Sequence, residues 1–409
     1  MKRFLFSVCA LAAVVVGCSK SEVLNRPNAE VPIEFNPYAG RVPVTRATAD
    51  NIKTLGTEGF QVYAFFHGES GEPDWASPYM NKVVKYGKKT EDATDSTWYY
   101  SGHAYWPASK ELAFIAYGLN AEDQITPVAD AMQKIDFTVA GAVASQKDLL
   151  VAAIQRNKTY VEGVTEGDGT VDFTFSHLLS RIGFSLVTKD NNSVPVTIEQ
   201  VKLKGTFYEK GRVDLSKAPT TTIKIGGEDK AAPRPVIEPG ESKLITYDLL
   251  PGGSYTSYGS DAGTPIYDNS MLYTKKEGET GTADDDEYVE NKFETAEGTV
   301  DAEAKKNAED QAAANLLNRY MMIIPTTTPA ISSDQPENKL AHNAELQVLY
   351  FLPGAGTFDQ VDVDLSAIQF EPGKSYDFKF KVSTAGISFT VTVEDWDETG
   401  NSGEIIKLN

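Results

Sequence analysis

Short runs of alternating apolar and polar residues recur along this chain, and they constrain its fold more than any other feature. A period of two is typical of a β-strand that buries one face. Turn-forming residues separate many of the runs, and helical periodicity is sparse, so the pattern predicts an all-β sandwich fold with a helix over residues 301–322. The clearest runs and turns are Ile33–Phe35, Phe60–Phe65, Ile182–Leu186, Val196–Leu203, Tyr376–Val382, Pro251–Gly253, Pro353–Gly354 and Pro372–Gly373.

The chain has 409 residues, which is too long for one ordinary domain and predicts two. A pair of strand patterns opens the stretch after residue 31, and another pair opens the stretch after residue 180. We therefore expect two tandem β-sandwich domains, over residues 31–175 and 176–409. An acidic insertion around residues 276–310 lies in the second domain, and its composition favours a solvated loop that leads into a surface helix.

Acidic residues outnumber basic ones, with 58 Asp and Glu against 38 Lys and Arg and a formal net charge of -20 at pH 7. Such a surface repels phosphate backbones, which excludes nucleic acid as a partner. The chain has only two Cys and four His. These are too few for a disulfide scaffold, a zinc ribbon or an iron–sulfur cluster, and we expect no cofactor and no metal site.

The amino terminus has the pattern of an export signal. Two basic residues precede an apolar run that is too short to span a bilayer. The segment Val15–Cys18 resembles a bacterial lipobox, which predicts cleavage after Gly17 and acylation of Cys18. Three acyl chains would hold the protein stably on a membrane, with residues 18–30 as a lipidated tether. The alternative is an ordinary secretory signal over residues 1–17 in which Cys18 is incidental.

No arrangement of residues predicts catalysis. The histidines are dispersed, and the chain contains no HExxH motif, nucleophile elbow or P-loop. His177 lies beside strand residues, so we expect a hydrogen-bonded structural histidine there. Residues 395–401 imitate the start of a calcium loop, but Thr399 and Ile406 stand where the loop needs metal ligands, so an acidic turn between two strands is favoured. We expect no catalytic residue, and a surface hydrolase is the least favoured function.

Aromatic residues are concentrated between Trp98 and Trp106. Exposed rings can stack on sugar faces, which makes Trp98 and Trp106 candidate glycan contacts. Alternate side chains of a strand point to opposite faces, so packing within a hairpin is the favoured interpretation of the cluster. A monomeric surface lipoprotein that binds glycans therefore stays open as an alternative function.

Besides the lipobox, eight groups of residues follow one another in a recognisable order: Ile33–Phe35 with Thr45–Ala47, Gly59–Phe65, Trp98–Tyr100, Tyr105–Pro107, Leu112–Tyr117, Lys147–Ala152, Phe175–Ile182 and Val391–Trp396. Each group alone is a common strand or turn. Taken in order along nearly the whole chain, they resemble the fimbrillin family of Bacteroidales, the lipoprotein pilins also called type V pilins. Residues 208–345 match this pattern least well.

The resemblance implies a structural, non-enzymatic protein made of two tandem transthyretin-like or immunoglobulin-like β-sandwiches. It implies export, lipidation at Cys18 and transfer to the outer-membrane surface. The implied partners are other fimbrial subunits and, for an adhesin, a ligand on a host or bacterial surface. In the family an Arg-directed protease cuts in the loop after the first strand, which matches a cut between Arg46 and Ala47 here and would also sever the lipid anchor.

Removal of the first strand is the step that the resemblance implies for assembly. The strand lost would contain Val31, Ile33 and Phe35, and a strand from another subunit would fill the exposed groove. Arg26 and Arg41 are competing basic sites for the protease. The alternative for these three arginines is a plain solvated surface residue. Anchor and tip subunits of the family also depart from the processing scheme.

The carboxy-terminal segment Gly403–Asn409 is the candidate donor strand. Its Ile406 and Leu408 are two residues apart, so both side chains would point to one face and could fill pockets. The same segment could equally be the last strand of the chain's own second sandwich.

Overall fold

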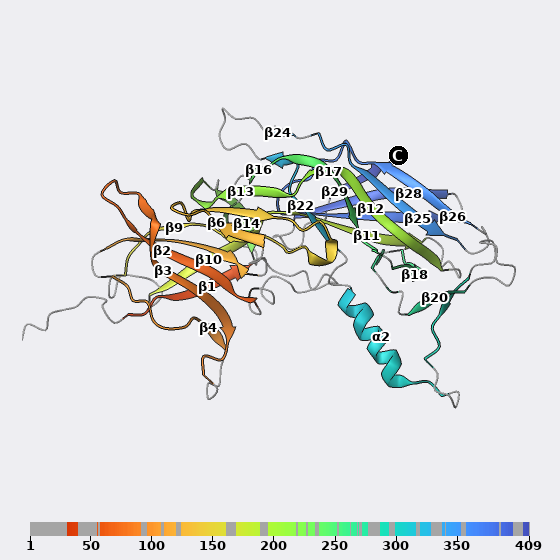
Figure 1. Cartoon of the computed structure of the whole chain (residues 1–409), viewed down its shortest axis with the longest axis horizontal. Helices are drawn as coiled ribbons and strands as arrows, with labels where there is room; N and C mark the ends of the chain where they lie inside the picture. The colour runs from red at the N-terminus through yellow and green to blue at the C-terminus, as the bar shows by residue number, and fades with distance from the viewer. Residues whose placement is uncertain are drawn as a thin grey trace, which may run out of the picture.

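Strands make up most of the regular structure in the computed structural model, which confirms the predicted all-β fold (Figure 1). Helical elements include α2 (Ala302–Asn315), η2 (Val143–Ser145) and η3 (Leu215–Lys217). The structure describes residues 31–39, 55, 58–90, 96–107, 110–119, 124–160, 169–188, 195–217, 220–225, 228–233, 237–251, 253–261, 263–267, 269, 272–276, 287–293, 299–315, 320–328, 338–339, 341–352, 357–383, 386–395 and 404–408.

An eight-stranded sheet forms the amino-terminal part of the molecule. Its strands run in the order β1-β10-β8-β5-β2-β3-β4, and β9 pairs with β5 off this path. The β1–β10 pair is parallel, whereas the other pairs are antiparallel. The strands are β1 (Glu34–Ala39), β2 (Phe60–His67), β3 (Pro73–Gly87), β4 (Thr97–Tyr99), β5 (Leu112–Gly118), β8 (Leu150–Ala152), β9 (Gln155–Lys158) and β10 (Thr170–His177).

Both faces of β2 are buried, which corrects the expectation that this run buries one face. Phe60 and Val62 belong to the core that the curved sheet encloses, together with side chains of β1, β5 and β10. Tyr63 and Phe65 point the other way, into a second core. The reason is a further sheet that covers the outer face of β2, so apolar residues are required at successive positions.

That covering sheet has four strands in the order β16-β13-β7-β6. They are β6 (Ile125–Pro127), β7 (Lys134–Thr138), β13 (Lys210–Asp214) and β16 (Ile237–Pro239). Since β7 precedes residue 175 and β13 follows it, the sheet draws strands from both predicted domains. Arg212 of β13 donates two hydrogen bonds to Asp136 of β7, at 2.6 and 2.8 Å. The domain division at residue 175 stays a prediction.

Two further sheets enclose the largest core of the molecule, in its carboxy-terminal part. One has the order β19-β11-β27-β28-β29, with β22 also paired to β11; the other has the order β17-β12-β25-β26, with β18 also paired to β12. The strands are β11 (Ser180–Thr188), β12 (Val196–Tyr208), β17 (Ser242–Asp248), β18 (Tyr255–Ser257), β19 (Thr264–Pro265), β22 (Met321–Ile323), β25 (Glu345–Phe351), β26 (Phe358–Asp364), β27 (Lys374–Ser383), β28 (Gly386–Asp395) and β29 (Glu404–Leu408). As in the first sheet, one neighbouring pair, β11 with β27, is parallel.

Three two-stranded hairpins and α2 are separate from these sheets. The hairpins are β14 (Thr220–Ile225) with β15 (Glu228–Pro233), β20 (Tyr273–Lys276) with β21 (Glu287–Glu290), and β23 (Thr327–Thr328) with β24 (Asn338–Lys339). Asp301 caps α2 by accepting hydrogen bonds from the backbone N–H groups of Glu303 and Ala304. In Figure 1 the helix extends away from the sheets.

The predicted helix over residues 301–322 is wrong at its carboxy-terminal end. The described helix stops at Asn315, and Met321 already belongs to β22. Met321 and Ile323 are fully buried, and β22 pairs with β11. A long-range strand pairing and burial therefore override the local helical composition.

Candidate functional site

The strand β1 lies at one end of the eight-stranded sheet. It pairs with β10 over six positions, from Glu34 opposite Thr170 to Ala39 opposite Phe175. Pro37 stands within this pairing, and a proline, which has no backbone N–H to donate, is found in strands at sheet edges. The local sequence therefore suits the terminal position that β1 occupies.

The backbone just before β1 is also bonded on the side away from β10. The Ile33 N–H donates to the Ala104 carbonyl at 2.9 Å, and the Trp106 N–H donates to the Val31 carbonyl at 3.0 Å. The Tyr100 hydroxyl donates to the Ile33 carbonyl at 2.6 Å. The first strand and its approach thus lie between β10 and the segment that follows β4.

Two side chains of this strand region fill the core of the amino-terminal sheet. Ile33 is 0% exposed and Phe35 is 6% exposed, whereas Glu34 between them is exposed. The alternation follows the period of two on which the sequence prediction depended. The Phe35 ring stacks on Phe173, with centroids 5.8 Å apart. It also contacts the rings of Phe60, Tyr100 and Phe114.

Gly169, which no sequence motif identified, packs closely against Trp106 and Val31 in this region. The backbone of Gly169 has a φ of +85°, which residues with a side chain rarely adopt. A Cβ atom there would lie 2.9 Å from the indole nitrogen of Trp106 and 3.0 Å from Val31. That indole N–H donates to the Gly169 carbonyl at 2.8 Å. The only sequence signal for this role is a glycine placed directly before an alternating run.

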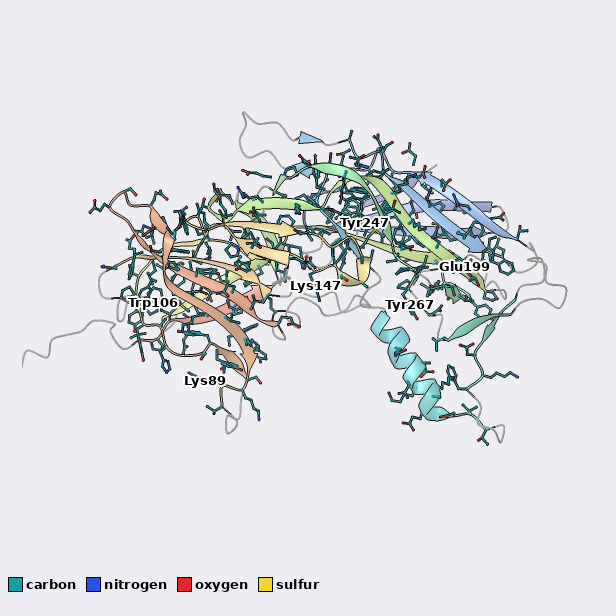
Figure 2. All side chains as sticks on the ribbon, in the orientation of Figure 1. Lys89, Trp106, Lys147, Glu199, Tyr247 and Tyr267 are labelled. Atoms are coloured by element: carbon teal, nitrogen blue, oxygen red, sulfur yellow. The ribbon has the colours of Figure 1, made fainter. Side chains whose placement is uncertain are left out.

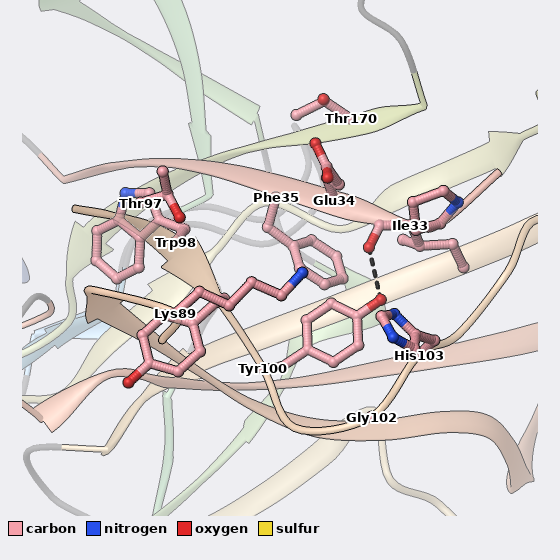
Figure 3. Close-up of a pocket in the computed structure, with 12 residues that line it drawn as sticks. Ile33, Glu34, Phe35, Lys89, Thr97, Trp98, Tyr100, Gly102, His103 and Thr170 are labelled. Atoms are coloured by element: carbon pink, nitrogen blue, oxygen red, sulfur yellow. Dashed lines mark hydrogen bonds between the residues drawn. The ribbon is translucent and has the colours of Figure 1, made fainter. Parts of the chain in front are cut away.

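A cavity of about 300 Å3 lies beside the first strand (Figure 3). Its walls come from three distant parts of the chain: the β1 region, the hairpin of β3 and β4 with the segment after it, and the start of β10. Burial raises the pKa of the Tyr100 phenol above its ordinary value, so this hydroxyl stays protonated and continues to donate at neutral pH. The lining residues are Pro32, Ile33, Glu34, Phe35, Lys89, Thr97, Trp98, Tyr99, Tyr100, Gly102, His103 and Thr170.

The two tryptophans predicted as candidate glycan contacts occupy different environments. Trp106 is 3% exposed, and Figure 2 places it among the side chains inside the amino-terminal sheets. Its ring packs against Phe114, so its role in this structure is packing. Trp98 is half-buried and lines the cavity, with its ring 5.6 Å from Phe60. Of the two, only Trp98 presents a surface to a ligand in this cavity.

The carboxy-terminal strand β29 lies at the end of its own six-stranded sheet. It pairs antiparallel with β28, with Ile406 opposite Val391 and Leu408 opposite Phe389. In the isolated chain this segment is therefore the last strand of the carboxy-terminal part, which is one of the two roles that the sequence left open. The preceding strand ends at Asp395, and residues 396–403 lie outside the described residues.

Several predicted positions lie outside the described residues. They are Gly17, Cys18, Arg26, Arg41, Arg46 and Ala47. The described part of β1 ends at Ala39, so the predicted cleavage position follows it by seven residues in the sequence.

His177 is a structural histidine, as predicted. It is 1% exposed, and its Nδ1 lies 2.5 Å from an oxygen of Asp148. It ends β10 where the chain turns towards β11, so the hydrogen bond fixes this turn.

Among the described residues, no three His, Cys, Asp or Glu side chains gather in a way that could hold a metal ion. No described helix combines the length and the apolar character needed to cross a membrane.

Comparison with known proteins gives consistent results. A family model described as Fimbrillin-like matches residues 45–273, more than half of the chain. The chain is 27% identical over 198 residues to the Fimbrium subunit Fim1C of Phocaeicola vulgatus; the match covers 44% of this chain and about half, 49%, of that protein.

Solved structures resemble the chain over most of its length at low sequence identity. One is a fimbrial protein from Bacteroides vulgatus, with 16% identity and a TM-score of 0.46, covering 89% of this chain and 99% of that one. Another is a fimbrial assembly protein from Parabacteroides distasonis, with 11% identity and a TM-score of 0.37, covering 92% of this chain and 98% of that one.

Proposed function

The chain belongs to the fimbrillin-like family, and from this premise we propose that it is a structural fimbrial subunit or fimbria-associated adhesin that assembles by strand exchange. In this proposal the chain is exported as a lipoprotein, anchored at Cys18 in the outer membrane, and performs no catalysis. A protease cut between Arg46 and Ala47 frees β1, and a strand from another subunit takes its place. The similarity to a fimbrium subunit supports the assembly role.

The observation that carries the proposal is that β1 is terminal in its sheet and yet fills the core. In the sheet order β1 lies at the end, beside β10, and the residues just before it form an isolated bridge with the segment after β4, Pro32 with Tyr105. Its departure would break these two pairings and leave the rest of the sheet order intact. Its departure would open the apolar positions that Ile33 and Phe35 fill. Burial of each of these side chains contributes about 1.5–3 kcal/mol to the free energy of folding, and this contribution would be lost. The departure of β1 would also expose the backbone edge of β10. An incoming strand with apolar residues two positions apart would satisfy both needs together.

Proteolysis is the physical means of removing such a strand. While β1 is joined to the chain, it remains at a high effective concentration beside its own groove and returns whenever it leaves. After a cut at Arg46 the strand belongs to a separate peptide. Once this peptide dissociates, its concentration beside the groove is low and it seldom rebinds. The same cut separates the sandwich from Cys18, so release from the membrane and exposure of the groove would be one event.

The test is limited digestion of the purified mature protein with an Arg-specific protease. We expect a new amino terminus at Ala47, loss of residues 18–46, and a ladder of heat-resistant polymers in gel electrophoresis. Arg46→Ala should abolish the new amino terminus at Ala47, whereas the matched control Arg41→Ala should leave it and the ladder intact. Because a cut after Arg41 would also follow β1, the double variant Arg41→Ala, Arg46→Ala should lose the ladder. A trimmed protein that stays monomeric at high concentration would contradict strand exchange.

We propose β29 as the donor strand. As the last strand of its sheet it has β28 as its neighbour among the described strands, and their pairing spans five positions. Its Ile406 and Leu408 have the same spacing as Ile33 and Phe35. Deleting residues 404–408 should leave trimming at Arg46 intact and abolish the ladder. If the deleted protein still polymerises, the donor strand comes from elsewhere.

Anchoring has its own test. Metabolic labelling with a fatty acid should label the unprocessed protein, and Cys18→Ala should remove the label. After digestion at Arg46 the label should remain with the short amino-terminal peptide. Label that stays on the large fragment would contradict the lipobox prediction.

A further inference from the structure

One cation lines the cavity beside β1 on a chain whose net charge is -20. Residues 79–107 contain the four lysines 82, 85, 88 and 89 together with His103, against Glu91, Asp92 and Asp95. Of these lysines, Lys89 lines the cavity. Its amino group is the feature of the lining that can attract a small anion.

Aromatic rings form one side of the cavity, and contacts with neighbouring groups fix the positions of two of them. Trp98 is supported by Phe60 and by Tyr86, with ring centroids 5.6 and 5.2 Å away. Tyr100 is fixed by its hydrogen bond to the backbone of Ile33. Trp98, Tyr99 and Tyr100 are each only partly buried. Rings that are fixed in place and partly exposed can pack against a flat apolar face without a large loss of side-chain entropy.

Polar groups complete the lining. Figure 3 shows the side chain of Lys89 extending into the view between Trp98 and Tyr100, with its amino group directed towards the β1 region. His103 also lines the cavity. Glu34 is the one carboxylate among the lining residues. The lining thus offers a cation, an acceptor and ring surfaces within one small cavity.

We propose that this cavity binds a single sugar ring that carries an anionic substituent, either a carboxylate or a sulfate. The aromatic rings would contact the apolar face of the sugar, Lys89 would pair with its anionic group, and Glu34 would accept a hydrogen bond from a ring hydroxyl. A volume of about 300 Å3 is at the lower end of the range for ligand pockets, which suits one ring.

The proposal goes beyond the fimbrial role and does not depend on strand exchange. One wall of the cavity is made of Ile33, Glu34 and Phe35, so the site is complete while β1 is in place. The binding test therefore uses the full, unprocessed chain, and its result is independent of whether trimmed protein polymerises.

The experiment titrates the full chain with methyl β-glucuronide, glucose 6-sulfate and methyl β-glucoside, and measures binding by ligand-observed NMR. We expect at least one of the two anionic sugars to bind at least tenfold more tightly than the neutral glucoside. Binding of the glucuronide alone would identify a carboxylate sugar, and binding of the sulfate alone would identify a sulfated one. Equal binding of all three sugars, or no binding of any, would overturn the proposal.

Two charge-reversal variants locate the site. Lys89→Glu should weaken binding of the anionic sugar at least tenfold. Lys88→Glu, which changes an exposed neighbour outside the lining, should change it less than twofold. Both lysines are exposed, so both variants should fold, which thermal unfolding can verify. Equal losses in the two variants would mean general charge attraction and would overturn a specific site.

Discussion

The indole N–H of Trp106 donates a hydrogen bond to the Gly169 carbonyl across 2.8 Å, and so it joins the two sides of the groove that β1 occupies. Trp106 belongs to the segment on one side of the strand, and Gly169 directly precedes β10 on the other. Neither group of this bond belongs to β1. We therefore expect the two walls to stay connected when the strand leaves, so that the groove is ready for another strand.

Gly169→Ala is the most direct test of this connection. The substitution places a side chain at a φ of +85° and brings its Cβ within 3.0 Å of Trp106. We expect a loss of roughly 1–3 kcal/mol in the free energy of unfolding, measured by urea denaturation. Gly141→Ala is the matched control, because a Cβ there meets no atom within 4 Å. Equal effects of the two substitutions would contradict the role of Gly169.

Phe35→Ala tests how much the first strand contributes to the core. The substitution removes a ring that contacts four other aromatic side chains, so we expect a loss of about 3–5 kcal/mol in the free energy of unfolding. Glu34→Ala, at the exposed neighbouring position, should change it by less than about 0.5 kcal/mol. If Phe35→Ala were as mild as the control, β1 would not be an integral part of the core.

Sequence alone predicted the local properties of this site. Alternation with a period of two is set by backbone geometry, so the inward direction of Ile33 and Phe35 followed from their spacing. Composition and turn residues were enough for the all-β fold. The aromatic cluster around Trp98 was visible, but its division into a buried Trp106 and a cavity-lining Trp98 was not.

What the sequence could not predict depends on contacts between distant residues. Glu34 pairs with Thr170, and no local pattern encodes a partner 136 positions away. The second buried face of β2 exists because β7 and β13 cover it. The cavity likewise needs residues from three separate parts of the chain. Lys89 lines a cavity only because the fold brings its segment beside β1.

His342 gives a prediction about pH. It is 1% exposed, its Nε2 lies 2.6 Å from the Ile368 carbonyl, and its Nδ1 accepts a hydrogen bond from the Ala344 N–H. An accepting Nδ1 carries no proton, so this geometry suits the neutral ring. Burial lowers the pKa of His342 below its ordinary value, which agrees with that geometry.

The sign of the pH effect follows from linkage. Below pH about 6.5 the unfolded chain binds a proton at this histidine that the folded chain excludes, so the free energy of unfolding falls as the pH falls. Urea unfolding at pH 7.5, 6.5 and 5.5 should show this decrease. His342→Gln should reduce the dependence on pH, whereas His103→Gln, at an exposed position, should not. A slope unchanged by His342→Gln would contradict the prediction.

A synthetic peptide of residues 31–39 should block assembly. If polymerisation requires the groove that β1 leaves, the free strand competes with the donor strand for the same backbone edge and the same two apolar positions. Added in excess to trimmed protein, the peptide should shorten the ladder of polymers and raise the midpoint of thermal unfolding of the trimmed monomer. A peptide with Ile33→Asp and Phe35→Asp keeps the backbone but places charge in an apolar trough, so it should do neither. Equal inhibition by both peptides would show that the side chains of β1 do not determine the exchange, and inhibition by neither would show that assembly uses another surface.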